Sequence, residues 1–143
     1  MAGREVGTGV ARGIVAAMAM TGMRRVTRGL GLVREPPPEE IARQVPRLLA
    51  RIPPEHRDEA IELAHWAYGA AGGAAFGALP RAVRRAAWSG PAWGIAAWTL
   101  FERVVAPIFG LRPARQRPPG ERLAVLGDHL LYGVVVAGRS RRP

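Results

Sequence analysis

The chain has 143 residues and no cysteine, and 21 basic residues against 11 acidic ones give it a formal net charge of +10. The length predicts one domain, and the absence of cysteine excludes a disulfide framework, a thiolate metal site and a cysteine nucleophile. The basic residues are arginines dispersed along the chain without an aromatic–basic motif, so the sequence predicts no nucleic-acid partner.

Four blocks rich in alanine and glycine follow one another, over residues 7–23, 60–79, 86–109 and 123–138. Arginines flank each block, as basic residues flank the spans of membrane proteins. About 20 mostly apolar residues cross the roughly 30 Å hydrocarbon layer of a bilayer. We therefore predict an all-α fold, a four-helix transmembrane bundle whose partners are the lipid bilayer and its anionic lipid headgroups. The alternative is a soluble all-α interaction protein in which the blocks are buried helices.

Small residues recur at four-residue spacing within the blocks, and the packing glycines among them are Gly13, Gly69, Gly73, Gly77, Gly94 and Gly133. Glycine inside a water-soluble helix costs roughly 1 kcal/mol relative to alanine. In lipid, by contrast, small residues allow two helix backbones to approach closely. We predict that these glycines pack helices together, either within the bundle or towards a homo-oligomer or another subunit of a membrane complex.

Residues 33–59, between the first two blocks, form the longest polar segment. Its apolar residues are spaced to share one helical face, although Pro46 interrupts them: Ile41, Val45, Leu48, Leu49 and Ile52. This pattern predicts a short amphipathic helix in the first loop. Two interpretations are open, because such a helix either lies at the membrane interface or packs against the bundle or a partner.

A motif of histidine, tyrosine and glycine occurs twice, as His65-Trp66-Ala67-Tyr68-Gly69 and as His129-Leu130-Leu131-Tyr132-Gly133. Gly31-Leu32 ahead of the first copy matches Gly110-Leu111 ahead of the second. Self-similarity of this kind predicts a repeated structural unit. We expect a single membrane domain over residues 1–143, built from two duplicated helical hairpins. Repeat one covers residues 7–79 with the inserted loop 33–59, and repeat two covers residues 88–138.

Polar side chains within the blocks are expected at one depth, because blocks two and four enter from the same side and block three runs the opposite way. The members of this polar membrane layer are His65, Tyr68, Glu102, Asp128, His129 and Tyr132. Such groups either relay protons or form interhelical hydrogen bonds that fix helix register. Their spacing identifies no metal site, and the chain carries no nucleophile–base pair or cofactor motif. We therefore predict no metal, no cofactor and no enzymatic activity.

The two His-x-x-Tyr-Gly motifs have Gly94, Trp98 and Glu102 between them, and Arg117-Pro118-Pro119-Gly120 precedes the second. This pattern resembles the YagU-like family of small uncharacterised bacterial inner-membrane proteins. The resemblance covers approximately residues 9–138. It implies a four-span, multi-pass protein of the bacterial inner (cytoplasmic) membrane and offers no catalytic residues.

Two functions are open on this sequence. One is a non-enzymatic helix-bundle scaffold or accessory subunit, and the other is a small transporter or oligomeric channel lined by the His/Glu layer. Two-span repeats keep the same orientation, which disfavours the alternating access of inverted repeats and leaves a pore formed by oligomers as the better transport variant. The scaffold is the preferred interpretation. Arginines near the span ends number eight on each side. The long polar loop therefore decides the expected orientation, with both termini in the cytoplasm.

Overall fold

The computed structural model describes residues 2–34, 36–111 and 116–138, which form helices and connecting turns without any strand. The expected all-α fold is confirmed at this level. The elements in chain order are α1 (Ala2–Gly29), α2 (Pro37–Gln44), α3 (Pro46–Leu49), the 3-10 turn η1 (Pro54–His56), α4 (Arg57–Ala78), α5 (Arg81–Arg85), α6 (Ser89–Leu100), the π-helical η2 (Phe101–Val105), α7 (Ala106–Ile108) and α8 (Pro119–Ala137).

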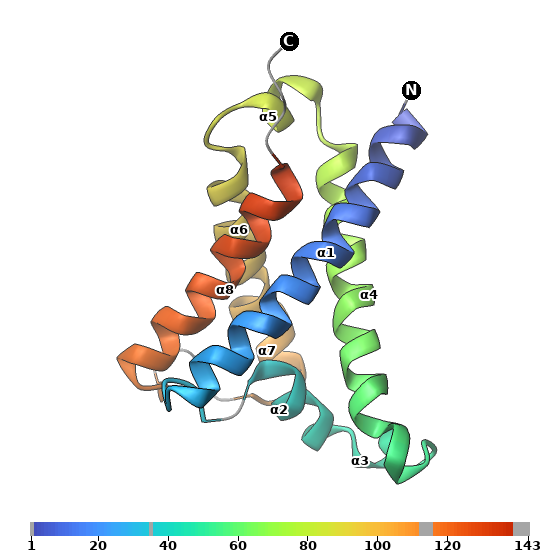
Figure 1. Ribbon diagram of the computed structural model, residues 1–143, viewed down its shortest axis with the longest axis vertical. Coiled ribbons are helices and arrows are strands. Elements are labelled where there is room, and N and C mark those ends of the chain that lie inside the picture. Colours follow the sequence, from blue (N-terminus) through green and yellow to red (C-terminus); the bar gives the residue numbers. More distant parts are fainter. Residues whose placement is uncertain (1, 35, 112–115, 139–143) are drawn as a thin grey trace.

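Four long helical segments of the described chain run up and down beside one another, and Figure 1 shows α5 at one end and α2 and α3 at the other. The start of α1 and the end of α8 both lie at the α5 end. The third segment consists of α6, η2 and α7, which continue into one another through residues with right-handed helical backbone angles. At 1.5 Å per residue, the four segments are roughly 28 to 42 Å long.

The π-helical turn η2 lies just before Pro107 in the third segment. Proline has no amide hydrogen, and its ring clashes with the carbonyl four residues earlier in a regular α-helix. A wider π-helical turn is one of the ways in which a helix accommodates such a break without ending. The segment therefore continues to Ile108 despite the proline.

Glycines bring the helices of each antiparallel pair into backbone contact. In the α1–α4 pair, a Cβ atom on Gly73 would lie 2.8 Å from the Cα of Gly13 and closer still to the carbonyl oxygen of Gly9. In the α6–α8 pair, a Cβ atom on Gly133 would lie 2.8 Å from the Cα of Gly94 and would overlap the carbonyl oxygen of Gly90. No residue larger than glycine fits at these contacts without separating the helices.

The ends of α1 and α7 have the same hydrogen-bonded structure. At α1, Leu32 N donates to Thr27 O (2.9 Å), and Gly31 has a φ of 72°. At α7, Leu111 N donates to Ala106 O (2.9 Å), and Gly110 has a φ of 64°. This is the Schellman arrangement, in which a left-handed residue ends the helix and glycine takes that conformation without strain.

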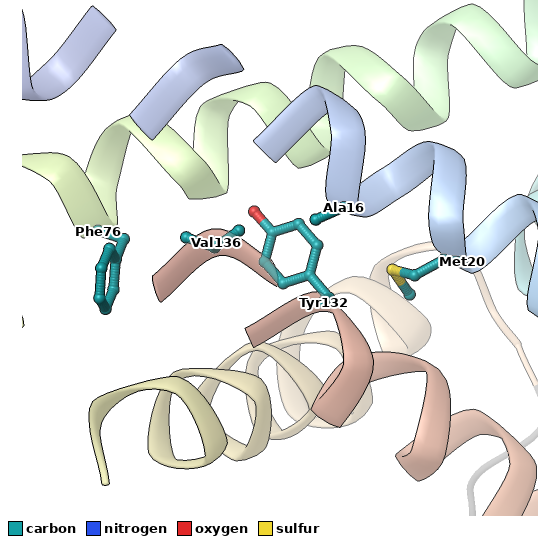
Figure 2. Packing of buried hydrophobic residues seen from close by; sticks show 5 residues of the cluster. All are labelled: Ala16, Met20, Phe76, Tyr132 and Val136. Carbon is teal, nitrogen blue, oxygen red and sulfur yellow. The ribbon is translucent and has the colours of Figure 1, made fainter. Parts of the chain in front are cut away.

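Helix α1 also packs against α8 and so joins the two pairs. Figure 2 shows the small cluster of buried side chains that fills this junction, namely Ala16, Met20, Phe76, Tyr132 and Val136. The Tyr132 hydroxyl donates a hydrogen bond of 2.6 Å to the carbonyl oxygen of Gly69 on α4. Phe76 of α4 meets Trp93 of α6 edge to face, with 5.5 Å between ring centroids.

The expected amphipathic helix of the first loop is divided into α2 and α3. The break falls at Val45, whose φ of −118° and ψ of 49° are outside the helical region. The residue before a proline is disfavoured in the α-helical conformation, which accounts for the break ahead of Pro46. Helix α2 packs against α4, whereas α3 contains no buried residue.

Among the described residues, one helix is long and apolar enough to cross a membrane by length and composition, over Gly3–Gly29 near the N-terminus. The four spans expected from the sequence are therefore not established by composition, and the duplicated hairpins also stay a prediction.

We expect Gly73→Ala and Gly133→Ala to destabilise the fold by roughly 1–3 kcal/mol each, because the added methyl group overpacks a backbone contact. Gly22→Ala is the matched control, since a Cβ there would meet nothing within 4 Å. That control should be neutral or stabilising by up to about 1 kcal/mol, because alanine is the better helix former. Thermal unfolding of the purified variants measures the difference, and equal melting temperatures for all three would contradict the glycine contacts.

Candidate functional site: a polar cluster between α1, α4 and α8

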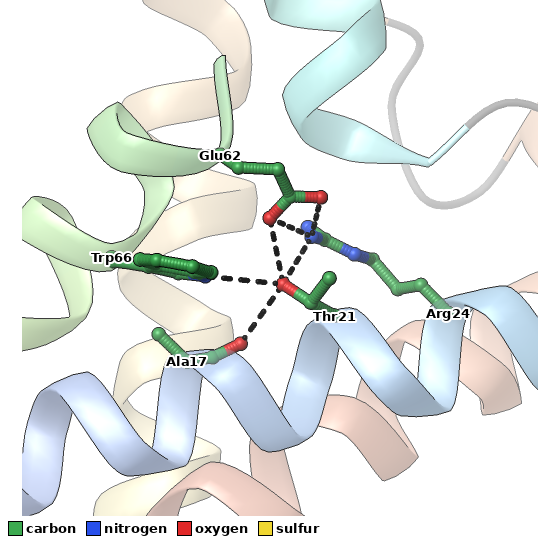
Figure 3. Close-up of polar contacts among 5 residues, drawn as sticks. All are labelled: Ala17, Thr21, Arg24, Glu62 and Trp66. Carbon is green, nitrogen blue, oxygen red and sulfur yellow. Dashed lines mark hydrogen bonds and ion pairs between the residues drawn. The ribbon is translucent and has the colours of Figure 1, made fainter. Parts of the chain in front are cut away.

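Arg24 of α1 and Glu62 of α4 form an ion pair between the two helices, with 3.4 Å between Nη2 and Oε2. Figure 3 shows Thr21 at the centre of the surrounding hydrogen bonds. The Thr21 hydroxyl is 2.8 Å from Glu62 Oε2 and accepts hydrogen bonds from Arg24 Nη2 (3.0 Å) and Trp66 Nε1 (3.4 Å). We call Thr21, Arg24, Glu62 and Trp66 the Arg24 cluster.

Helical spacing explains why these four side chains meet. Thr21 and Arg24 are three residues apart on α1, and Glu62 and Trp66 are four residues apart on α4, so each pair shares one helical face. The Arg24 side chain is only 6% exposed and that of Glu62 is 27% exposed. A guanidinium so deeply buried is stable only with a nearby carboxylate and with hydrogen-bond acceptors for its N–H groups.

Two histidines and an aspartate lie beside the Arg24 cluster. His129 is buried, and its Nδ1 lies 2.8 Å from the carbonyl oxygen of Val125, which assigns the hydrogen to Nδ1. Arg24 acts electrostatically on both His65 and Asp128, and the two imidazoles also interact with each other. His65 Nδ1 and Asp128 Oδ1 are buried without a hydrogen-bond partner in the described part of the chain.

The third segment contributes Phe101 to this region, where we had expected Glu102. Phe101 is buried, with its ring centroid 5.7 Å from that of His129. Glu102 is the next residue of the π-helical turn η2 and is half-buried. The carboxylate that pairs with Arg24 is that of Glu62, and the place of Glu102 in the polar layer stays a prediction.

The two tyrosines of the repeated motif differ in burial. Tyr132 is 5% exposed and holds α8 against α4 through its bond to Gly69, whereas Tyr68 is 47% exposed. Gly72 provides the space for the Tyr132 hydroxyl, because a Cβ there would overlap it. The structure thus brings His65, Asp128, His129 and Tyr132 into one region and leaves Tyr68 at its edge.

A second charged group, which sequence reasoning missed, lies where α2 meets the start of α8. Arg117 Nη2 is 3.1 Å from Glu40 Oε2, and Arg117 Nη1 is 3.7 Å from Glu121 Oε1. All three side chains are at most 2% exposed. Glu121 is in the first turn of α8, where the helix dipole favours a negative charge. The only sequence signal was that both glutamates follow a run of prolines, at Pro36 and Pro118.

These two groups provide ion pairs and hydrogen bonds between helices. Among the described residues, no three or more histidine, aspartate or glutamate side chains are grouped so that they could hold a metal ion. The arrangement fixes how α1, α2, α4 and α8 sit against one another. The partnerless atoms of His65 and Asp128 are the positions at which a proton could be gained or lost.

Comparisons with protein-family models, curated proteins and solved structures find no match to this chain. The resemblance to the YagU-like family is therefore untested by them, and the function has to be argued from the structure alone.

We expect Glu62→Leu to destabilise the fold more than Glu62→Gln, because the amide still accepts hydrogen bonds from Thr21 and Arg24. The loss for Glu62→Leu should be smaller than the roughly 3–5 kcal/mol of a fully buried broken pair, since Glu62 is partly exposed. The double variant Arg24→Leu/Glu62→Leu should recover part of this loss. Equilibrium unfolding in detergent gives the three free energies of unfolding.

Glu5→Leu is the control, because it breaks the exposed ion pair of 2.7 Å between Glu5 and Arg84. An exposed pair contributes at most about 1 kcal/mol. If the double variant were less stable than Glu62→Leu, or if Glu5→Leu lost as much stability as Glu62→Leu, the result would contradict the dependence of the buried Arg24 on Glu62.

Proposed function

We propose that this protein is an integral membrane protein with four spans and that it acts as a non-enzymatic helix-bundle scaffold or accessory subunit. The observation that carries the proposal is the distribution of side chains, because Arg24, Asp128 and His129 are buried within the bundle while large apolar side chains are exposed on each of the four long segments. A water-soluble protein has the opposite arrangement.

Large apolar side chains are exposed on each of the four long segments. They are Val15, Met18, Met23 and Val26 on α1, Leu63 on α4, Ile95, Leu100, Val104 and Ile108 on the third segment, and Leu123 and Val134 on α8. The buried residues of the same helices include many glycines and alanines and the polar Thr21, Arg24, Asp128 and His129, beside the small apolar cluster around Tyr132. Apolar surface on all sides is unfavourable in water but suits the hydrocarbon of a bilayer.

The positions of the exposed polar groups also suit a helix bundle in a lipid bilayer. Arg25 and Arg28 of α1, and Arg81 and Arg85 of α5, are exposed at opposite ends of the helices. The exposed hydroxyl of Thr99, within α6, donates to the Ile95 carbonyl oxygen of its own helix (2.8 Å). A hydroxyl bonded in this way needs no water, which is the requirement for a polar group that faces lipid.

The second, third and fourth segments do not meet the helix length and hydropathy of an ordinary membrane span, and the reason can be given for each. Glu62, Asp128 and two histidines lie within α4 and α8, and η2 interrupts the third segment as a regular α-helix. The ionisable groups face the interior of the bundle, where partners lower the cost of burying them in a membrane. Segment lengths close to the roughly 30 Å of hydrocarbon support one crossing each.

We also propose that the two helix pairs arose by duplication. The matching Schellman ends at Gly31 and Gly110 and the glycine contacts of both pairs support this. The sequence motif aligns Gly69 with Gly133. In the structure, however, the α4 residue at the position equivalent to Gly133 is Gly73, because Gly73 contacts two glycines of α1 as Gly133 contacts two glycines of α6. The second pair is therefore shifted by one helical turn relative to the first.

The scaffold has more support than the transporter or channel. A path through the bundle needs space between helices, and the backbone contacts at Gly13, Gly73, Gly94 and Gly133 leave none within either pair. An open hollow lies outside the bundle, at residues 44–48. The buried, partnerless atoms of His65 and Asp128 are what still favours proton movement, and dye-monitored proton flux in proteoliposomes would separate the two functions.

The fold also alters the expected orientation. The count of arginines near the span ends left out Arg43, Arg47 and Arg51, which lie in the long loop between the first two spans. Helix α2 packs on α4, and this packing holds the loop close to the end of the helices. All three are exposed there. The positive-inside rule then favours the α2 and α3 end as the cytoplasmic one, opposite to the orientation that the sequence favoured.

If the protein is integral to the membrane, it should stay in the pellet when membranes are extracted with alkaline carbonate, because buried spans are not released by breaking ionic contacts. Immunoblotting of both fractions measures this. A known peripheral protein in the same membranes is the control, and release of this protein alongside it would refute the proposal.

For the orientation, a reporter that fluoresces only in the cytoplasm should be dark when fused after Pro143. An alkaline phosphatase fusion at the same position should be active, because that enzyme needs the oxidising periplasm. The reverse pattern, with equal amounts of both fusions, would return the termini to the cytoplasm.

A further inference from the structure

The segment over residues 41–54 has a chemistry unlike the rest of the first loop. It contains Arg43, Arg47 and Arg51 at four-residue intervals and no acidic residue. Arg47 and Arg51 are exposed, and Leu48 beside them is 59% exposed. Positive charge and an uncovered apolar side chain therefore occur together at this end of the helices.

This segment is held in place from both sides. On one side, Glu40 of α2 is tied to the buried Arg117, and Ala42 is buried. On the other, Arg57 Nε at the start of α4 lies 3.2 Å from the carbonyl oxygen of Leu49 and 3.1 Å from that of Ile52. These bonds fix the backbone of α3 and leave Arg47, Leu48 and Arg51 directed outwards.

The bend between α2 and α3 also forms an open hollow of about 400 Å³, lined by Gln44, Val45, Pro46, Arg47 and Leu48. Val45, Pro46 and Leu48 give this hollow an apolar wall, and the exposed Arg47 also lines it. A guanidinium binds phosphate oxygens in a forked geometry, and an apolar wall suits the upper part of an acyl chain.

We propose that the surface formed by Arg47 and Leu48 of α3 and by Arg51 of the turn that follows binds the headgroup of an anionic phospholipid. The inference rests on the proposed membrane location, which places α3 at the level of the headgroups beyond the ends of the spans. Basic residues next to a membrane attract anionic lipids, each contributing modestly. Both kinds of phospholipid carry a phosphate and acyl chains, so the two guanidinium groups distinguish them by net charge, because the ammonium group of a zwitterionic lipid cancels the charge of its phosphate.

The test uses the purified full-length chain in a neutral detergent, with its melting temperature measured before and after adding lipid. Phosphatidylglycerol should raise the melting temperature by about 3–6 °C, because a ligand that binds only the folded state stabilises it. Phosphatidylcholine and inorganic phosphate should each give less than half of that shift. Added salt should reduce the shift.

The double variant Arg47→Gln/Arg51→Gln should lose at least half of the phosphatidylglycerol shift, and Leu48→Gln should lose a smaller part. Arg81→Gln/Arg85→Gln is the matched control, with the same change in charge at exposed positions of the opposite end, and should keep the shift. Equal loss in both double variants, an equal shift with phosphatidylcholine, or an equal shift with inorganic phosphate would each overturn the proposal.

Carbonate extraction of the same variants distinguishes a failure of the proposed lipid site from a failure of the proposed membrane location. If the unmodified chain is released by carbonate, the membrane location fails. If it stays integral but shows no preference for phosphatidylglycerol, only the lipid site fails. The Arg47→Gln/Arg51→Gln variant should stay in the membrane and fold normally, because neither side chain is buried.

Discussion

The close approach of helix backbones at Gly13, Gly73, Gly94 and Gly133 is the constraint on which the rest of this structure depends. Helices in such contact have no room at the contact for large side chains, and outside the small cluster around Tyr132 many of the large apolar side chains project outwards. Association then relies on van der Waals contact and hydrogen bonds between helices, which are the forces that operate in lipid. The outward-facing apolar surface is a consequence of the same contacts.

Two buried arginines complete the packing at the α2 end, each beside at least one glutamate from another element. Arg24 joins α1 to α4 through Glu62, and Arg117 joins α8 to α2 through Glu40. Replacing a buried ion pair by apolar groups is often neutral for stability, whereas removing one partner is costly. Such pairs therefore select one arrangement of the helices, and they set where the basic loop lies.

The shift of one turn between the two helix pairs gives their common motif different surroundings. Tyr132 reaches across the bundle to Gly69 and is buried, while the corresponding Tyr68 is at the surface. His129 bonds to its own helix beside Phe101, while His65 lies near Arg24. Two copies of one sequence motif thus have two structural roles, because a motif specifies a helical face and leaves open what that face meets.

The sequence by itself determined the features that depend on neighbouring residues. The blocks rich in alanine and glycine predicted the long helices, and four-residue spacing indicated which glycines share a face. Gly31 and Gly110, which the repeat aligned, end their helices as glycine permits. Only the tertiary structure decided that Glu62 of α4 meets Arg24 of α1, and that Glu40 is joined to Arg117 from the far end of the chain. Helical spacing fixes the direction of a side chain relative to its own helix, but the rotation and register between helices depend on contacts among residues distant in sequence.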